Sequence, residues 1–151
     1  MGGSRAVLMV GLFLLASASA PLASSHTQQT LTVILVEDGV VSGNITDPAF
    51  VQGNALWFRM EDNTENTTMK VRLDIDQDGV FNASDDFEST DLVHECELNE
   101  TGALVDEDCA VSATYAFSMN ATVGTYAFWV HRTSNEAETV YIPDRDRGTL
   151  C

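Results

Sequence analysis

Apolar and polar residues alternate along most of the chain after the first 25 residues, with the period of two that half-buried β-strands show. The clearest case is segment 69–75, where apolar residues fall on one face and charged residues on the other. The same pattern predicts strands over 30–36, 56–60, 111–119, 126–130 and 140–142, with a seventh over 92–98. No helical periodicity longer than a turn and no internal repeat occurs beyond the N-terminal segment.

Turn residues, namely Gly, Asn, Asp and Pro, separate these six to seven short strands. The chain offers no helices that could cross between parallel strands. We therefore predict an all-β fold, an antiparallel two-layer sandwich. About 125 residues remain after the N-terminal segment, which suffices for one domain with a modest core. The expected domain spans residues 26–151.

Segment 124–130, with the sequence GTYAFWV, resembles the penultimate strand of immunoglobulin-like and fibronectin-like domains. The resemblance implies that Tyr126 is a corner residue whose hydroxyl bonds to backbone, and that Trp129 faces the opposite side of the strand. Unlike antibody domains, the chain has no cysteine at Phe128. Both aromatic residues are interpreted as packing residues rather than ligand contacts.

Residues 1–25 have the pattern of a secretory signal peptide: a short basic start ending at Arg5, an apolar run over 6–15, and then small residues. The run is short for a membrane span. Pro21 disfavours cleavage directly after Ala20, so we expect processing between residues 20 and 25. The alternative is an uncleaved anchor helix. No later apolar run approaches span length, so the mature chain is predicted to be secreted or held at the cell surface without a membrane span.

The chain carries 23 acidic and 7 basic residues, a formal net charge of −16. Loss of Arg5 with the signal would make it 6 − 23 = −17. Such a chain repels nucleic acid and anionic lipid, which excludes both as favoured partners. Lys70 is the only lysine. This balance suits a protein kept soluble in salty surroundings, and it also suits one that collects divalent cations.

Three cysteines are present, and an exported protein is expected to oxidise what it can. Cys96 and Cys109 flank an acidic, turn-like stretch over 97–108, so we predict that they form a disulfide. It would stabilise the fold by roughly 3 kcal/mol. Zinc binding is the competing interpretation, but no CxxC motif or nearby histidine pair supports it. Cys151 is left for pairing between chains, or unpaired.

Five N-x-[ST] sequons suggest a glycosylated surface, with turn-rich composition as the alternative interpretation. The predicted glycosylation sites are Asn44, Asn66, Asn99 and Asn120. The fifth sequon begins at Asn82, where a glycan would hinder the ligand role described next.

Segment 74–85, DIDQDGVFNASD, resembles an EF-hand or dockerin-type calcium loop. Calcium takes six to eight oxygen ligands, which alternate carboxylates can supply from a loop turned by a glycine, here Gly79. The resemblance implies a ligand set of side chains and, at position 80, a backbone carbonyl. The implied ligands are Asp74, Asp76, Asp78, Val80, Asn82 (directly or through water) and Asp85.

This loop departs from the family pattern at its end, because Asp85 replaces the usual Glu, and Phe81 and Asp86 are atypical. A strand rather than a helix leads into it, and one loop argues against a dockerin, which carries two. We therefore expect a single loop inserted over 74–86 in the β domain, with an affinity on the order of 0.1 to 1 mM. A solvated acidic turn without metal is the alternative.

The sequence shows no recognisable pairing of a catalytic nucleophile with a base. His26, His94 and His131 are far apart in the sequence, and no G-x-S-x-G motif occurs. We therefore predict a non-enzymatic, secreted or cell-surface, acidic, calcium-binding module with a binding, adhesion or structural role. Its expected partners are a calcium ion and another surface protein or a glycan. The alternatives are a subunit of a surface layer or filament, and a secreted hydrolase whose acids are hidden among the many carboxylates.

Overall fold

The structure is a computed structural model that describes residues 28–41, 52–135, 137–141 and 149–150. The predicted signal peptide and the sequon at Asn44 lie outside these residues. The described strands are β1 (Thr30–Val36), β2 (Gly39–Val41), β3 (Ala55–Met60), β4 (Thr68–Leu73), β5 (Phe87–Glu88), β6 (Ser112–Ala116), β7 (Gly124–Thr125), β8 (Phe128–Thr133), β9 (Glu138–Tyr141) and β10 (Thr149–Leu150).

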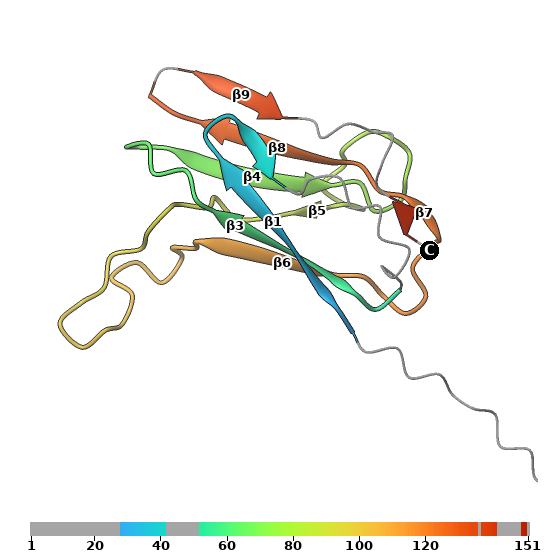
Figure 1. Cartoon of the computed structure of the whole chain (residues 1–151), viewed down its shortest axis with the longest axis horizontal. Coiled ribbons are helices and arrows are strands. Elements are labelled where there is room, and N and C mark those ends of the chain that lie inside the picture. Colours follow the sequence, from blue (N-terminus) through green and yellow to red (C-terminus); the bar gives the residue numbers. More distant parts are fainter. Residues whose placement is uncertain (1–27, 42–51, 136, 142–148, 151) are drawn as a thin grey trace, which may run out of the picture.

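Two four-stranded sheets make up the body of the protein (Figure 1). The first has the strand order β2-β1-β3-β6, and the second has the order β5-β4-β8-β9. Strands β10 and β7 form a separate two-stranded pair. Neighbouring strands are antiparallel except β1 and β3, which are parallel. The described residues contain no helix, so the predicted all-β two-layer sandwich is confirmed.

The core lies between the two sheets and is built from alternate residues of each strand. Phe58 of the first sheet meets Phe128 of the second edge to face, with ring centroids 5.5 Å apart. The buried apolar residues are Val33, Leu35, Leu56, Phe58, Met60, Met69, Val71, Leu73, Leu92, Phe117, Phe128 and Val130. This alternation is the period of two read from the sequence.

The predicted strand over 92–98 does not form. Leu92 makes isolated bridges with Met69 and Ala110, and Leu98 makes one with Leu104. Only Leu92 of this segment is buried, so there is no continuous face for the core to hold in an extended strand. Conversely, β2 and β5 were not predicted, because two or three residues are too few to show a period.

Two expectations about segment 124–130 agree with the structure. The hydroxyl of Tyr126 donates to the carbonyl of Thr122. Trp129 lies between Phe128 and Val130, which are both buried in the core, so its side chain points to the outer side of the sheet.

A buried ion pair joins the two sheets. Arg132 on β8 donates from Nε to Oδ2 of Asp62, which follows β3, at 2.7 Å, and the Asp62 side chain is 1 % exposed. Burial favours the neutral form of Asp62, but hydrogen bonds from Thr64 and Arg132 outweigh it and hold the pKa of Asp62 below its usual value. The buried carboxylate of Asp62 is therefore stabilised in its charged form by hydrogen bonds from Thr64 and Arg132.

Candidate metal centre

The acidic loop over 74–86 connects β4 to β5 at one end of the sandwich (Figure 1). Its first residue is anchored to the neighbouring strand region, because the backbone N–H of Asp74 donates to the carbonyl of Ala127 at 2.9 Å. A strand leads into the loop, as predicted, and the short strand β5 follows it. The fold therefore presents this loop directly from a sheet, without helical support.

Three carboxylates converge in the first half of the loop. Asp74, Asp76 and Asp78 each offer an oxygen, and these atoms all lie within 4.8 Å of one another. Two oxygens bound to one calcium ion at 2.3 to 2.6 Å lie at most about 5 Å apart. The spacing of the three oxygens therefore suits a shared metal ion. This group is the one of its kind in the part of the chain that the structure describes.

Asp74 is the distinctive member of the group because it is only 2 % exposed. Its Oδ2 accepts a hydrogen bond from the backbone N–H of Gly79 at 2.8 Å. Its Oδ1 is buried and has no hydrogen-bond partner among the described residues. Buried polar groups are almost always partnered in native proteins, so this oxygen has the environment of a ligand atom.

The electrostatics of Asp74 agree with that description. Burial raises the pKa of Asp74, and the nearby carboxyls of Asp76 and Asp86 raise it further. The backbone amides of Gly79 and Gln77 lower it only in part. The carboxylate form is thus disfavoured by its surroundings, and a cation placed beside it would reverse that balance.

The backbone of the loop is shaped by local hydrogen bonds and by two residues with positive φ. Gly79 has φ +81° and Gln77 has φ +63°. Oδ1 of Asp76 accepts from the N–H of Asp78 at 3.2 Å, and Oδ1 of Asp78 accepts from the N–H of Val80 at 2.7 Å. These turns, in which an aspartate side chain bonds backbone two residues later, bend the chain around the acidic group.

The remaining predicted ligands lie further along the loop. Asn82 donates from Nδ2 to Oδ2 of Asp85 at 2.9 Å, and its Oδ1 accepts from the hydroxyl of Ser84 at 2.9 Å. Asn82 and Asp85 therefore contact each other and are not part of the three-carboxylate group. The ligand roles of Asn82, Asp85 and the Val80 carbonyl stay predictions.

Asp86 has a role that the sequence did not indicate. Its Oδ1 accepts from the N–H of Ile75 and its Oδ2 from the N–H of Asn82, both at 2.7 Å. One carboxylate thus ties the start of the loop to its second half. In the sequence Asp86 is one acid among many, and only the proximity of the two N–H groups distinguishes it.

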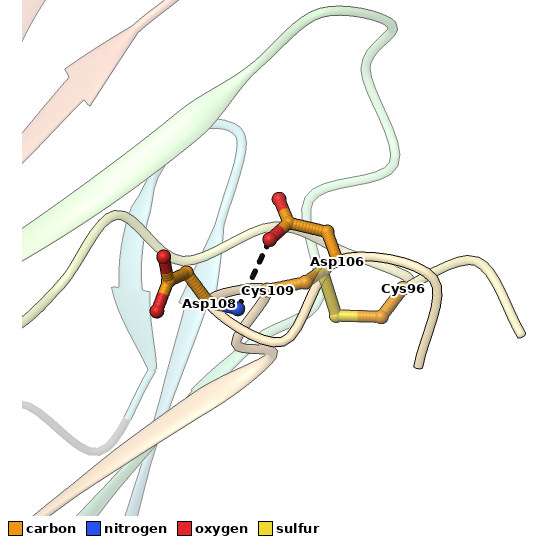
Figure 2. Close-up of a disulfide and its surroundings, with 4 residues drawn as sticks. All are labelled: Cys96, Asp106, Asp108 and Cys109. Carbon is orange, nitrogen blue, oxygen red and sulfur yellow. Dashed lines mark hydrogen bonds between the residues drawn. A yellow bond between two sulfur atoms is a disulfide. The ribbon is translucent and has the colours of Figure 1, made fainter. Parts of the chain in front are cut away.

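The second predicted site, the disulfide between Cys96 and Cys109, is present, with Cα atoms 5.9 Å apart (Figure 2). Within the loop that it closes, Oδ1 of Asp106 accepts from the N–H of Asp108 at 3.0 Å. Since the two sulfurs are bonded to each other, neither cysteine is left as a thiolate for zinc. This loop and the acidic loop lie at opposite ends of the sandwich (Figure 1).

The described sequon residues Asn66, Asn99 and Asn120 are all exposed. Asn99 makes the most contacts of the three, because its Oδ1 accepts from the N–H and hydroxyl of Thr101 and from the N–H of Ala103. These three bonds all use Oδ1 and not the amide nitrogen Nδ2, the atom that a glycan would modify. Glycosylation at these positions stays a prediction.

Neither described histidine, His94 or His131, belongs to the three-carboxylate group. His131 contacts Arg72 and Glu138 on the outer side of the second sheet, at 3.3 and 3.5 Å. His94 lines a shallow groove with residues 64, 66–68, 93 and 95, in which Glu95 is the one carboxylate.

In the described residues, no helix is long and apolar enough to cross a bilayer.

Compared with protein-family models and with curated proteins, the chain matches none. The assignment of a function therefore rests on the geometry of the acidic loop and on the chemistry of its residues.

Proposed function

We propose that this protein is an exported, acidic β-sandwich module that binds one calcium ion in the loop over 74–86. The observation that supports the proposal best is the buried Oδ1 of Asp74, which lacks a partner and belongs to a residue grouped with Asp76 and Asp78. An acidic turn that merely faces water would expose its carboxylates. Here the first of them is turned inward, where a cation would satisfy it.

Calcium is the ion that this donor set favours. The grouped residues supply oxygen alone, whereas zinc prefers nitrogen and sulfur ligands. Magnesium demands near-ideal octahedral geometry and keeps several waters, so a loop that offers several carboxylates and a carbonyl suits calcium better. In the proposed site Asp74, Asp76 and Asp78 are ligands, and the Val80 carbonyl, Asn82, Asp85 and water complete the shell.

The proposed role of the ion is structural, because it would neutralise three converging carboxylates and hold the loop against the end of the sandwich. The disulfide supports export, since disulfides persist in oxidising surroundings. We propose a binding, adhesion or structural role rather than catalysis.

Thermal unfolding in calcium and in EDTA tests the proposal. With a dissociation constant on the order of 0.1 to 1 mM, 10 mM calcium stabilises the native state by about 1.4 to 2.7 kcal/mol. For a domain of this size this raises Tm by roughly 5 to 12 °C. Magnesium chloride at equal ionic strength is the control for charge screening, and it should give a clearly smaller shift. A wild-type Tm equal in calcium and EDTA would reject the site.

A further inference from the structure

The outer side of the first sheet differs in composition from the rest of this acidic protein. Its outward residues are identified by strand register, because the residues between them are buried in the core. These outward positions, called the neutral face below, are Thr30, Thr32, Ile34, Val36, Val41, Ala55, Trp57, Arg59, Ser112, Thr114 and Ala116. The set contains no carboxylate.

The centre of the neutral face is apolar and hydroxylated. Trp57 is half-buried and lies between Thr32 on β1 and Thr114 on β6, which are its direct cross-strand partners and are both exposed. Arg59 is the one charged residue of the face, and its Nε donates to Glu61, just beyond the end of β3, at 2.9 Å. The face is thus a sheet surface with a single ion pair at its rim.

The outer side of the second sheet shows what this protein presents to water. It carries charged side chains in register on neighbouring strands, and Arg72 on β4 pairs with Glu88 on β5 at 2.6 Å. Lys70 lies within 3.9 Å of Glu88 and 3.6 Å of Asp91. None of the acidic residues that the structure describes belongs to the neutral face, so the two outer sheet surfaces differ in charge.

We propose that the neutral face packs against the same face of a second copy of this chain. Two copies that each carry a net charge of −16 repel one another strongly. Of the two outer sheet surfaces described, the neutral face is the one on which two copies meet without bringing carboxylates together. Its rim supplies one cation and one anion, Arg59 and Glu61, which can exchange partners across a twofold axis.

The size of the face sets the strength of this contact. The four strands are spaced about 4.8 Å apart and are three to seven residues long, so they cover roughly 350 Å². Two copies would therefore bury on the order of 700 Å², below the range of about 1,200 to 2,000 Å² for stable interfaces. The expected dimer is weak and forms at high local concentration, as on a crowded surface. It does not depend on the calcium site.

Sedimentation equilibrium of the exported chain tests the proposal, from about 10 µM to 1 mM, the range in which weak contacts are populated. Cys151→Ser is used throughout, so that a disulfide between chains cannot mimic the contact. We expect the mean mass to rise from monomer toward dimer with concentration. Added salt should strengthen the association, because it screens the repulsion between two acidic copies. A monomer at every concentration and salt level overturns the proposal.

Substitutions at Thr114 locate the contact. Both Thr114→Glu and Thr114→Lys place a charge at the centre of the face, and each is expected to weaken association at least about tenfold. The Lys variant separates burial from net charge, because it lowers the overall repulsion. Matched controls are Thr133→Glu and Thr133→Lys, at an exposed position on the outer side of the second sheet. These should change the dissociation constant less than about twofold.

Two results would contradict this assignment to the neutral face. One is a stronger association of the Thr114→Lys chain, which would mean that only net charge matters. The other is an equal effect of the Thr133 variants, which would place the contact elsewhere. Each variant is first checked for a wild-type unfolding midpoint, and Thr32→Glu replaces Thr114→Glu if that chain is unstable. The test leaves the calcium proposal untouched, since calcium-dependent unfolding is measured separately.

Discussion

Replacing Asp74 by Asn is expected to stabilise the protein without calcium and to remove most of the stabilisation that calcium provides. Without metal, the wild-type carboxylate is buried with Oδ1 unpartnered and with Asp76 and Asp78 close by. Leaving a buried polar group unpartnered costs about 1 to 3 kcal/mol. The Asn side chain has nearly the same shape, can still accept from Gly79, and offers an N–H₂ group to the neighbouring carboxylates. The variant should therefore unfold at a higher temperature than wild type in EDTA.

With calcium the difference in stability shifts by about 1 to 2 kcal/mol in favour of the wild type, because the Asp74→Asn substitution removes one of the charged ligands. The wild type gains about 1.4 to 2.7 kcal/mol in 10 mM calcium, whereas the variant should gain less than about 0.5 kcal/mol. Differential scanning calorimetry in EDTA and in calcium measures both differences. Asp38→Asn, in the exposed turn between β1 and β2, makes the same charge change and should leave the calcium response intact.

The refuting result is specific. If Asp74→Asn destabilises the protein equally in EDTA and in calcium, then Asp74 is a structural carboxylate satisfied by Gly79 alone. In that case the loop is an acidic turn and its calcium assignment is wrong.

Two further predictions concern the buried ion pair and the disulfide. Since the pKa of Asp62 lies below its usual value, its ionised form contributes stability that is present above about pH 4 and is lost as pH falls through the lowered pKa. Urea unfolding from pH 5 to pH 2 should show this loss, and Asp62→Asn should flatten it. The series is best run in the Asp74→Asn chain, because the raised pKa of Asp74 acts with the opposite sign. Replacing Cys96 and Cys109 together by Ala should lower the free energy of unfolding by about 3 kcal/mol. Calcium affinity by calorimetry should stay unchanged, because the two loops lie at opposite ends of the sandwich (Figure 1), and a large loss of affinity would contradict that independence.

The sequence by itself predicted those features that depend on neighbours along the chain. Alternation over 69–75 identified the face of β4 that is buried, because successive strand residues point to opposite sides. The carboxylates at 74, 76 and 78 converge because their spacing and the turn at Gly79 are local properties. The disulfide followed from two cysteines that flank one acidic turn.

Only the tertiary structure decided which distant residues meet. The parallel pairing of β1 with β3 leaves no mark on the alternation of either strand, since both orientations bury the same face. The Asp62–Arg132 pair joins residues 70 positions apart, and a charge pattern does not say which acid finds which base. Segment 92–98 alternated like a strand but lacked a partner to pair with along its length.

The same division holds for the two proposals. Spacing predicted the acidic loop, but the burial of Asp74 and the clamp by Asp86 depend on how the loop is folded back on β4. The neutral face is assembled from four strands, and its lack of carboxylates becomes visible only when their register is known. The alternation of apolar and polar residues predicts which side of a strand is buried, because backbone geometry points successive side chains to opposite faces. Which strands lie side by side is fixed by the packing of the whole core, and no single segment encodes it.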